Sequence, residues 1–471
     1  MSDNYENTTP VEENAVVDET VDIPETEIEL DLTDIEEETA NPELTMTTGQ
    51  KVKVLLMKPL WSSIVKWVFI FFGIVGAVLY FIASSSRQTG EQFSKVFSGI
   101  AGGISSFFSL IPISMFEILI AAAAVGILAY LVYIIVRTVQ VKGAFHKGGL
   151  WVQFGYTLLA VAGVFAILSS MCYGVFTYRE RLSKSTDYSS AKVTNMEFSE
   201  TMLYLIDGLN NAYYDGMDNI FFTKKNLSQY QQRGSAVKAI TEKVCEAFEA
   251  AAEDIPTLKG PKLKAKELLF TPLYSANQIA SIYSPFTGEI CINTDYPEVL
   301  VAMQVAKTIA MQRGYTDDGD AEFIAFLVCT QYSDDYYINY SGYFNAYMTF
   351  SSQYYKSNGK DLHLYMANAL HHKVKKEFVA VVKELDELYD IPSDIGFVAA
   401  QDTLSSAKYS DIAKLLLVKF RDQVDEGSPV IDDTEPVSYG NYCNYLTNFY
   451  KIDYDFQDEV DYVYEEYHPE Y

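Results

Sequence analysis

The chain has 471 residues and a formal net charge of −28, yet only 21% of its residues are charged whereas 49% are hydrophobic. The acidity lies at the ends: residues 1–50 hold 16 Asp and Glu without a Lys or Arg, and residues 425–471 hold 13 against a single Lys. A nucleic-acid surface needs a basic stripe that displaces counterions from phosphates, so this distribution argues against nucleic acid as a partner.

The N-terminal segment, residues 1–50, repeats Glu, Asp, Thr and Val and contains Tyr5 as its only aromatic residue. Such a composition cannot bury enough apolar surface to offset the conformational entropy of the chain. We therefore expect a disordered acidic tail.

Three apolar segments follow, at about residues 64–84, 115–136 and 151–176; the second carries only Glu117 as a charge and the third carries none. Each supplies the roughly 20 residues that an α-helix needs to cross about 30 Å of hydrocarbon. Residues 51–182 are therefore predicted to form a membrane domain with three transmembrane helices in the lipid bilayer.

The basic residues beside these spans predict the orientation. Six Lys and Arg stand before the first span and in the second loop, against five in the first loop and after the third span. This small excess favours a cytoplasmic N-terminus. With three spans, we expect a multi-pass cell-membrane protein whose C-terminal domain is extracytoplasmic.

Residues 183–424 are expected to form a mainly helical outer domain. Apolar residues recur at spacings of three and four in four segments: 198–212, 236–251, 373–388 and 408–424.

A short β-sheet is expected within this domain. Residues 282–283 and 289–292 have strand character and are separated by a Pro-Phe-Thr-Gly turn at 285–288. A helix then begins near Pro297 and ends before Gly314, and the next helix begins in an acidic turn at 317–320.

The C-terminal segment, residues 425–471, is acidic and contains nine tyrosines after residue 438. We expect a solvated tail that docks partly through its rings; a strip that binds cations or a partner is the alternative. The five cysteines lack CxxC spacing, which excludes a zinc knuckle but leaves both disulfides and buried free thiols open.

Five short stretches carry a further signal: Tyr283-Ser-Pro-Phe-Thr-Gly-Glu289, Asn293-Thr-Asp295, Gln312-Arg-Gly314, Ala321-Glu-Phe-Ile-Ala-Phe-Leu327 and Tyr340-Ser-Gly-Tyr343. Together with upstream matches they resemble a bacterial family of membrane-anchored, gluzincin-like metallopeptidases over about residues 60–424. The resemblance implies a membrane protein with three transmembrane α-helices followed by a mainly α, zincin-like outer domain with a short sheet.

In that family, the helix before Gln-Arg-Gly carries His-Glu-x-x-His, and a Glu from the next helix is the third zinc ligand. The alignment places Lys307, Thr308 and Met311 at the His, Glu and His positions, and Asp320 at the third ligand. An ammonium repels a divalent ion, a thioether suits zinc poorly, and a hydroxyl is no general base. We expect that zinc has been lost, that there is no other cofactor, and that the family's catalysis is absent.

The histidines offer no substitute in the sequence. His371 and His372 are adjacent and point to different faces of a helix beside three lysines, which indicates a solvated helix face.

The favoured hypothesis is a catalytically inactive metallopeptidase homologue that acts as a membrane-anchored binding or regulatory module of the envelope. An extended peptide or an envelope protein would pair with the retained segment, whose cleft candidates are Ser284, Pro285, Phe286, Thr287, Gly288, Glu289, Asn293 and Asp295. The competing interpretation is that this Pro and Gly simply set a turn.

The alternative functions are a hydrolase with unrecognised catalytic residues and a purely structural scaffold. A charged, accessible cleft above the former metal position favours binding, and a filled one favours the scaffold.

One structural prediction concerns the charge of the lost ion. We expect the ammonium of Lys307 near Asp320, Asp317 or Asp318, and Met311 in the volume of the second imidazole. The alternative is that Lys307 extends into an open cleft and Asp320 only caps its helix.

Overall fold

The computed structural model describes residues 47, 50, 64–216, 233–367, 369–389 and 436–453. Residues 1–56 form one unit and residues 57–471 another. In the first unit, the backbone N–H of Thr47 donates to Oε1 of Gln50. The predicted helix 408–424 and nearly all of the predicted N-terminal tail lie outside the described residues.

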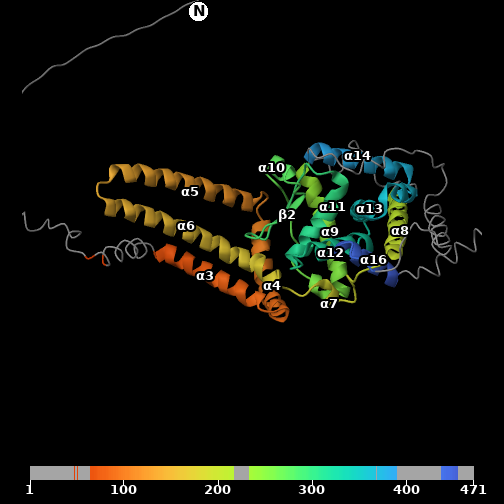
Figure 1. Cartoon of the computed structure of the whole chain (residues 1–471), viewed down its shortest axis with the longest axis horizontal. Helices are drawn as coiled ribbons and strands as arrows, with labels where there is room; N and C mark the ends of the chain where they lie inside the picture. The colour runs from red at the N-terminus through yellow and green to blue at the C-terminus, as the bar shows by residue number, and fades with distance from the viewer. Residues whose placement is uncertain are drawn as a thin grey trace, which may run out of the picture. The chain divides into compact units, whose positions relative to one another are not determined.

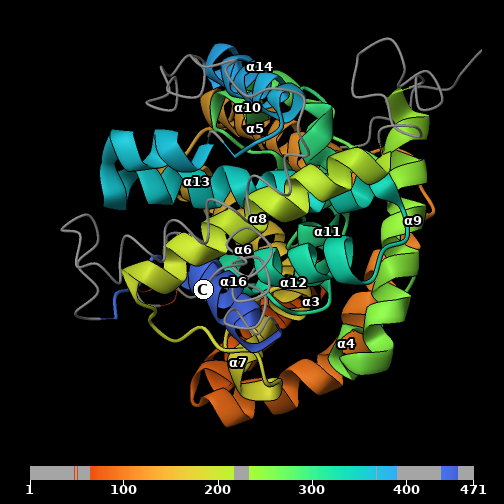
Figure 2. The ribbon, with the colours of Figure 1, turned by 90° about the vertical axis from the view of Figure 1, so that its right-hand side faces the viewer.

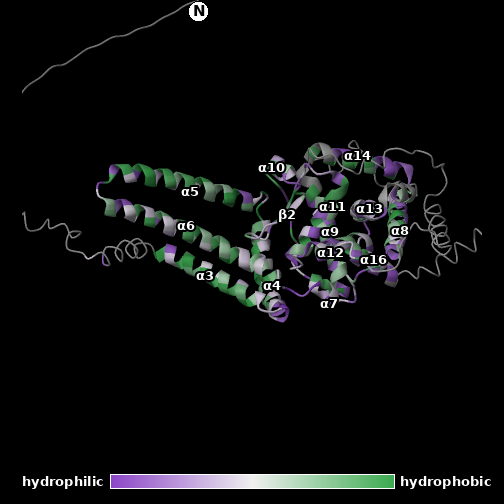
Figure 3. Ribbon diagram, viewed as in Figure 1, coloured by the Kyte–Doolittle hydropathy of each residue, from purple (hydrophilic) through white to green (hydrophobic). Residues whose placement is uncertain are grey.

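Three long apolar helices cover most of the three predicted apolar segments (Figures 1 and 3). They are α3 (Ile64–Ser84), α5 (Met115–Gln140) and α6 (Ala144–Cys172), and each is long and apolar enough to cross a membrane. The 3-10 helix η1 (Gly174–Phe176) follows α6.

The three helices do not pack equally. Gly73 of α3 meets Gly163 of α6 so closely that an added Cβ would lie 2.5 Å from the Gly163 Cα. Helix α5 touches α6 through Tyr130 and Phe154, whose ring centroids are 5.6 Å apart. Within this single chain, helix α5 therefore leaves much of its apolar surface exposed.

A further helix, α4 (Arg87–Ser109), fills the connection between the first two spans and was not expected. The hydroxyl of Ser86 caps it by accepting a hydrogen bond from the N–H of Thr89 at 3.1 Å. Its small residues Gly90, Ala101 and Gly102 are buried, which leaves its larger apolar side chains on other faces.

The outer domain is mainly helical, as expected (Figure 2). Its elements are α7 (Leu182–Ser185), α8 (Asn195–Gly216), α9 (Arg233–Asp254), η3 (Pro256–Leu258), α10 (Thr271–Ala276), η4 (Glu298–Leu300), α11 (Val301–Gln312), α12 (Asp318–Gln331), α13 (Tyr336–Ala367), α14 (His372–Tyr389) and α16 (Asn441–Asp453). The predicted helices 198–212, 236–251 and 373–388 fall within α8, α9 and α14.

The predicted short sheet is also present. Its strands are β1 (Lys266–Glu267), β2 (Ser281–Tyr283) and β3 (Ile290–Ile292), in the order β1-β3-β2. Strand β3 runs antiparallel to β2 and parallel to β1, so it is paired on both edges.

Helix α16 shows that part of the expected C-terminal tail docks on the domain through its rings. Tyr445 and Leu446 are fully buried, and the Tyr445 ring stacks on Phe323 of α12 at 4.9 Å. Residues 441–450 contain no Asp or Glu, so their rings can form an apolar face although acidic residues stand on both sides. The packed domain therefore continues past residue 424.

Candidate functional site

The three residues that the resemblance aligns with the zinc motif, Lys307, Thr308 and Met311, lie on α11, which packs against α12 after the turn at Gly314. Gly314 has φ of +96°, a left-handed conformation in which a side chain is strained. The side chain of Asp317 caps α12 by accepting the N–H of Asp320. This connection fixes the end of α11 against the acidic first turn of α12.

Lys307 lies between two carboxylates of α12. Its Nζ is 2.9 Å from Oε1 of Glu322 and 3.2 Å from Oδ1 of Asp318. Burial by itself lowers the pKa of Lys307, but the attraction of Glu322 and Asp318 outweighs it, so the pKa is raised. The lysine therefore carries a firm positive charge. Asp318 was one of its expected partners; Glu322 was missed, although it lies one turn further on the same face of α12.

Asp320 points elsewhere, so the pairing of Lys307 with Asp320 is wrong. Its carboxylate accepts hydrogen bonds from the N–H of Leu182 at 3.1 Å and the hydroxyl of Tyr445 at 2.8 Å. Burial raises the pKa of Asp320 in spite of these donors. Residues 318 and 320 are two apart on a helix and do not share a face. A lysine that pairs with Asp318 is therefore not expected to reach Asp320 as well. The cap of α12 is Asp317, which also excludes the alternative role for Asp320.

The other two motif positions are built into the helix. The hydroxyl of Thr308 is buried and donates to the carbonyl of Gln304 at 2.7 Å. Met311 is half-buried and packs against the domain core. Neither Lys307 nor Thr308 fits a zinc ion, and the described residues contain no group of three or more His, Cys, Asp or Glu that could hold a metal. The loss of zinc stays a prediction.

A cavity of about 740 Å³ opens beside the Lys307 ion pair. Its walls come from the start of α12, the middle of α13, α14 and the beginning of α16: Gln278, Asp317, Asp318, Gly319, Glu322, Met348, Thr349, Ser352, Gln353, Lys356, Val382, Leu385, Tyr439, Gly440, Asn441, Tyr442 and Cys443. Asp318 and Glu322 thus bind Lys307 and line the cavity at the same time. The wall combines apolar side chains with a few polar and charged ones.

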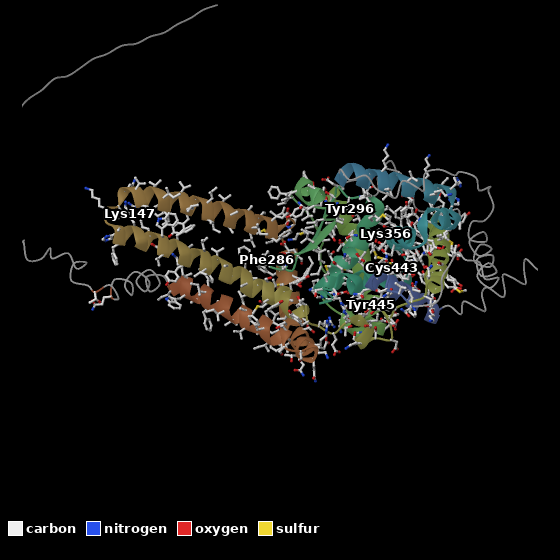
Figure 4. All side chains as sticks on the ribbon, viewed as in Figure 1. Lys147, Phe286, Tyr296, Lys356, Cys443 and Tyr445 are labelled. Atoms are coloured by element: carbon white, nitrogen blue, oxygen red, sulfur yellow. The ribbon has the colours of Figure 1, made fainter. Side chains whose placement is uncertain are left out.

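The expected cleft edge is not part of this cavity. Ser284, Thr287, Gly288, Glu289 and Asn293 are buried, and Pro285, Phe286 and Asp295 are half-buried, but none of the eight lines it. The ring of Phe286 packs on Phe165 of α6 at 4.8 Å, and Figure 4 shows Phe286 beside the apolar helices, away from Lys356 and Cys443. Strand β3 has no free edge for a peptide because both of its neighbours are strands. The Pro and Gly of this segment set a turn, in which Gly288 has φ of +63° and lies against Ser105 of α4.

The same turn joins the domain to the membrane helices. Glu289 accepts hydrogen bonds from the N–H groups of Met115 at 3.1 Å and Phe116 at 2.8 Å, at the start of α5. It also forms a buried ion pair with Lys266 of β1. The Lys266 ammonium donates to the carbonyls of Phe108 at 2.7 Å and Ile113 at 3.0 Å. A carboxylate thus caps a helix N-terminus, where the helix dipole favours a negative charge.

The expected solvated helix face holds for His372, which is exposed, but not for His371. His371 is buried and stacks on Tyr213 at 4.7 Å, and burial lowers its pKa to about 4. His363 is also buried, with its Nε2 2.6 Å from the Ser351 hydroxyl. All five cysteines are buried and free, which confirms the free-thiol alternative.

Comparison with known proteins gives one match. The family described as "Protein of unknown function (DUF3810)" matches residues 93–400, about two thirds of the chain. No curated protein and no solved structure matches. The match begins within α4 and includes α5, α6 and the helices that surround the Lys307 ion pair. The chain therefore belongs to the DUF3810 family.

Proposed function

We propose that this protein is a membrane-anchored binding module of the envelope, and that the cavity beside Lys307 receives an extended peptide or a segment of an envelope protein. The observation that carries the proposal is the cavity itself. Its volume of about 740 Å³ is typical of ligand sites, and its lining combines apolar side chains with a few polar and charged ones.

The position of the cavity supports a relation to the gluzincin-like metallopeptidases that the sequence resembles. In such an enzyme a peptide cleft lies above the metal. The resemblance aligns Lys307 with the first metal ligand, and the two carboxylate partners of Lys307 line the cavity. An open, charged cleft at this place favours a binding module over a scaffold whose cleft is filled.

A pair of tryptophan substitutions on α13 tests the proposal. Ser352 lines the cavity, whereas Ser357 is exposed on the same helix and does not line it. Detergent-solubilised full-length protein would be screened against a library of extended decapeptides, and the tightest peptide measured by fluorescence anisotropy. We expect Ser352→Trp to weaken binding at least tenfold and Ser357→Trp to leave it unchanged.

The alternatives give different outcomes in the same experiment. Failure of every peptide to bind, or an equal loss in both variants, would favour a scaffold. Cleavage of bound peptides, detected by mass spectrometry, would favour a hydrolase. Elemental analysis of the same sample should find less than stoichiometric zinc.

The orientation is part of the proposal. We place the N-terminus in the cytoplasm and the domain after α6 outside it. Protease added to intact cells should then remove the outer domain and leave an N-terminal tag intact. Loss of the N-terminal tag alone would reverse the assignment.

A further inference from the structure

Large apolar side chains are exposed on the part of the outer domain that lies next to α5. Leu269, Phe270 and Leu273 stand at the start of α10 and are 47%, 52% and 61% exposed. Figures 1 and 2 both place α10 beside the N-terminal end of α5. These three exposed side chains together form a patch of apolar surface.

The depth of this patch is fixed by Glu117, the only acidic residue of α5. Its carboxylate accepts hydrogen bonds from the N–H of Leu269 at 2.9 Å and of Phe270 at 3.1 Å, and the residue is only 3% exposed. Glu117 lies in the first turn of a helix that is apolar enough to cross a membrane. The backbone at the start of α10 therefore lies at the level where α5 enters the bilayer.

Helix α4 and the residues after it carry a second set of exposed apolar side chains. Val96, Ile100 and Phe107 recur at helical spacing on one side of α4 and are 69%, 44% and 63% exposed; Leu110 follows at 73% and Ile113 at 46%. This region is held at the same level, because Lys266 donates to the carbonyls of Phe108 and Ile113 while its partner Glu289 caps α5.

We propose that the first set and the last three members of the second form one interfacial collar, comprising Leu269, Phe270 and Leu273 with Phe107, Leu110 and Ile113, that inserts into the bilayer on the side of the outer domain. The occupant of this surface is lipid, because the collar is continuous with the apolar surface of α5 and tied to its first turn. Amphipathic elements of this kind lie at the boundary between headgroups and acyl chains. The collar anchors the domain against the membrane through more than its three helices.

Depth-dependent quenching tests this inference. Because all five native cysteines are buried, single cysteines introduced at exposed sites can be labelled selectively with the fluorophore NBD. The full-length chain would carry Leu273→Cys or Leu110→Cys and be reconstituted in phosphatidylcholine vesicles that contain lipids with a doxyl quencher at acyl position 5 or 12. Unsubstituted protein measures background labelling.

Two control sites define the scale. Val125→Cys lies within α5 at a position that is 67% exposed, and Lys238→Cys lies on α9, where the lysine side chain is 60% exposed. We expect the collar labels to be quenched at least twofold more by position 5 than by position 12, the Val125 label to show the reverse order, and the Lys238 label to be quenched by neither.

The result that would overturn the collar is equally specific. Collar labels that emit as in water and resist both quenchers would mean that this surface faces solvent. A blue-shifted emission without quenching would mean that protein, either a second copy or a partner, covers it. Two labelled positions, on separate elements, keep the test decisive if one variant does not fold.

Discussion

Two lysine–carboxylate pairs in this chain have the same chemistry and different surroundings. The side chains of Lys266 and Glu289 are 2% and 0% exposed, whereas Lys307 is 18% exposed and its partners Glu322 and Asp318 are 30% and 77% exposed. The first pair is sealed between the small sheet and α5; the second faces the cavity. A sealed pair makes a rigid joint, and an open pair leaves charge available to a ligand.

The largest effect should come from breaking the sealed pair. Glu289→Gln leaves Lys266 as an unpaired buried charge and weakens the cap on α5, so we expect a loss of about 3–5 kcal/mol in the free energy of unfolding. Urea unfolding of the full-length chain in detergent, followed by near-UV circular dichroism of the many tyrosines in the domain after α6, measures it. A loss below about 1 kcal/mol would contradict the assignment of this pair as a joint.

A third carboxyl group, that of Glu377, should make the free energy of unfolding depend on pH. Glu377 is partly buried, Tyr340 donates a hydrogen bond to it at 2.9 Å, and burial raises its pKa to about 7. The folded state then holds a proton that the unfolded state has released above about pH 4.5. The free energy of unfolding should fall as the pH rises from about 4.5 to about 7, by at most about 1.4 kcal/mol per pH unit, and should become independent of this group above that range. Glu377→Gln should flatten this part of the profile, and an unchanged profile would mean that another group titrates.

A neutral donor to a buried carboxylate should have an intermediate effect. Tyr445→Phe removes the hydroxyl that donates to Asp320 and leaves the N–H of Leu182 as its remaining donor among the contacts described above. We expect a loss of about 1–3 kcal/mol in the free energy of unfolding. Asp320→Asn in the same background should add little, which a double-mutant cycle would measure.

The smallest effect on stability should come from the open pair. Lys307→Met removes a pair whose carboxylates are partly solvated, so we expect a change of no more than about 1 kcal/mol in thermal unfolding. The same variant should also change the affinity of the cavity for a peptide. We expect this change in binding free energy to be larger than the change in the free energy of unfolding. A large loss of stability would mean that the Lys307 pair contributes to folding as strongly as the buried Lys266–Glu289 pair.

The sequence predicted the elements that have strong local signals. Long apolar runs identified α3, α5 and α6, and the Pro-Phe-Thr-Gly turn between apolar triplets identified β2 and β3. Helix α4 was missed because its buried face is made of Gly, Ala and Ser, which carry little hydrophobic signal. Helix α13 was missed because tyrosine, asparagine and serine dominate its sequence.

The site was harder to predict because it depends on contacts between distant segments. The partnership of Lys307 with Asp318 was among those expected from the sequence, but the cavity wall includes the beginning of α16, which looked like part of an acidic tail. The segment Ser284–Asp295 looked like an accessible edge because nothing local shows that β1 pairs with β3 on its other side.

Helix α16 also constrains how the domain can fold. Its Tyr445 hydroxyl bonds to Asp320 and to the backbone of Ser183, which lie 125 and 262 residues earlier in the chain. Contacts of such long range cannot form until residue 445 has been synthesised, and folding that depends on them is slow. The membrane helices can therefore insert, and α8 to α14 can collapse, while the core still lacks the helix that closes it. The cavity acquires its last wall at the same late step, so a nascent chain cannot engage a ligand there before α16 has been synthesised.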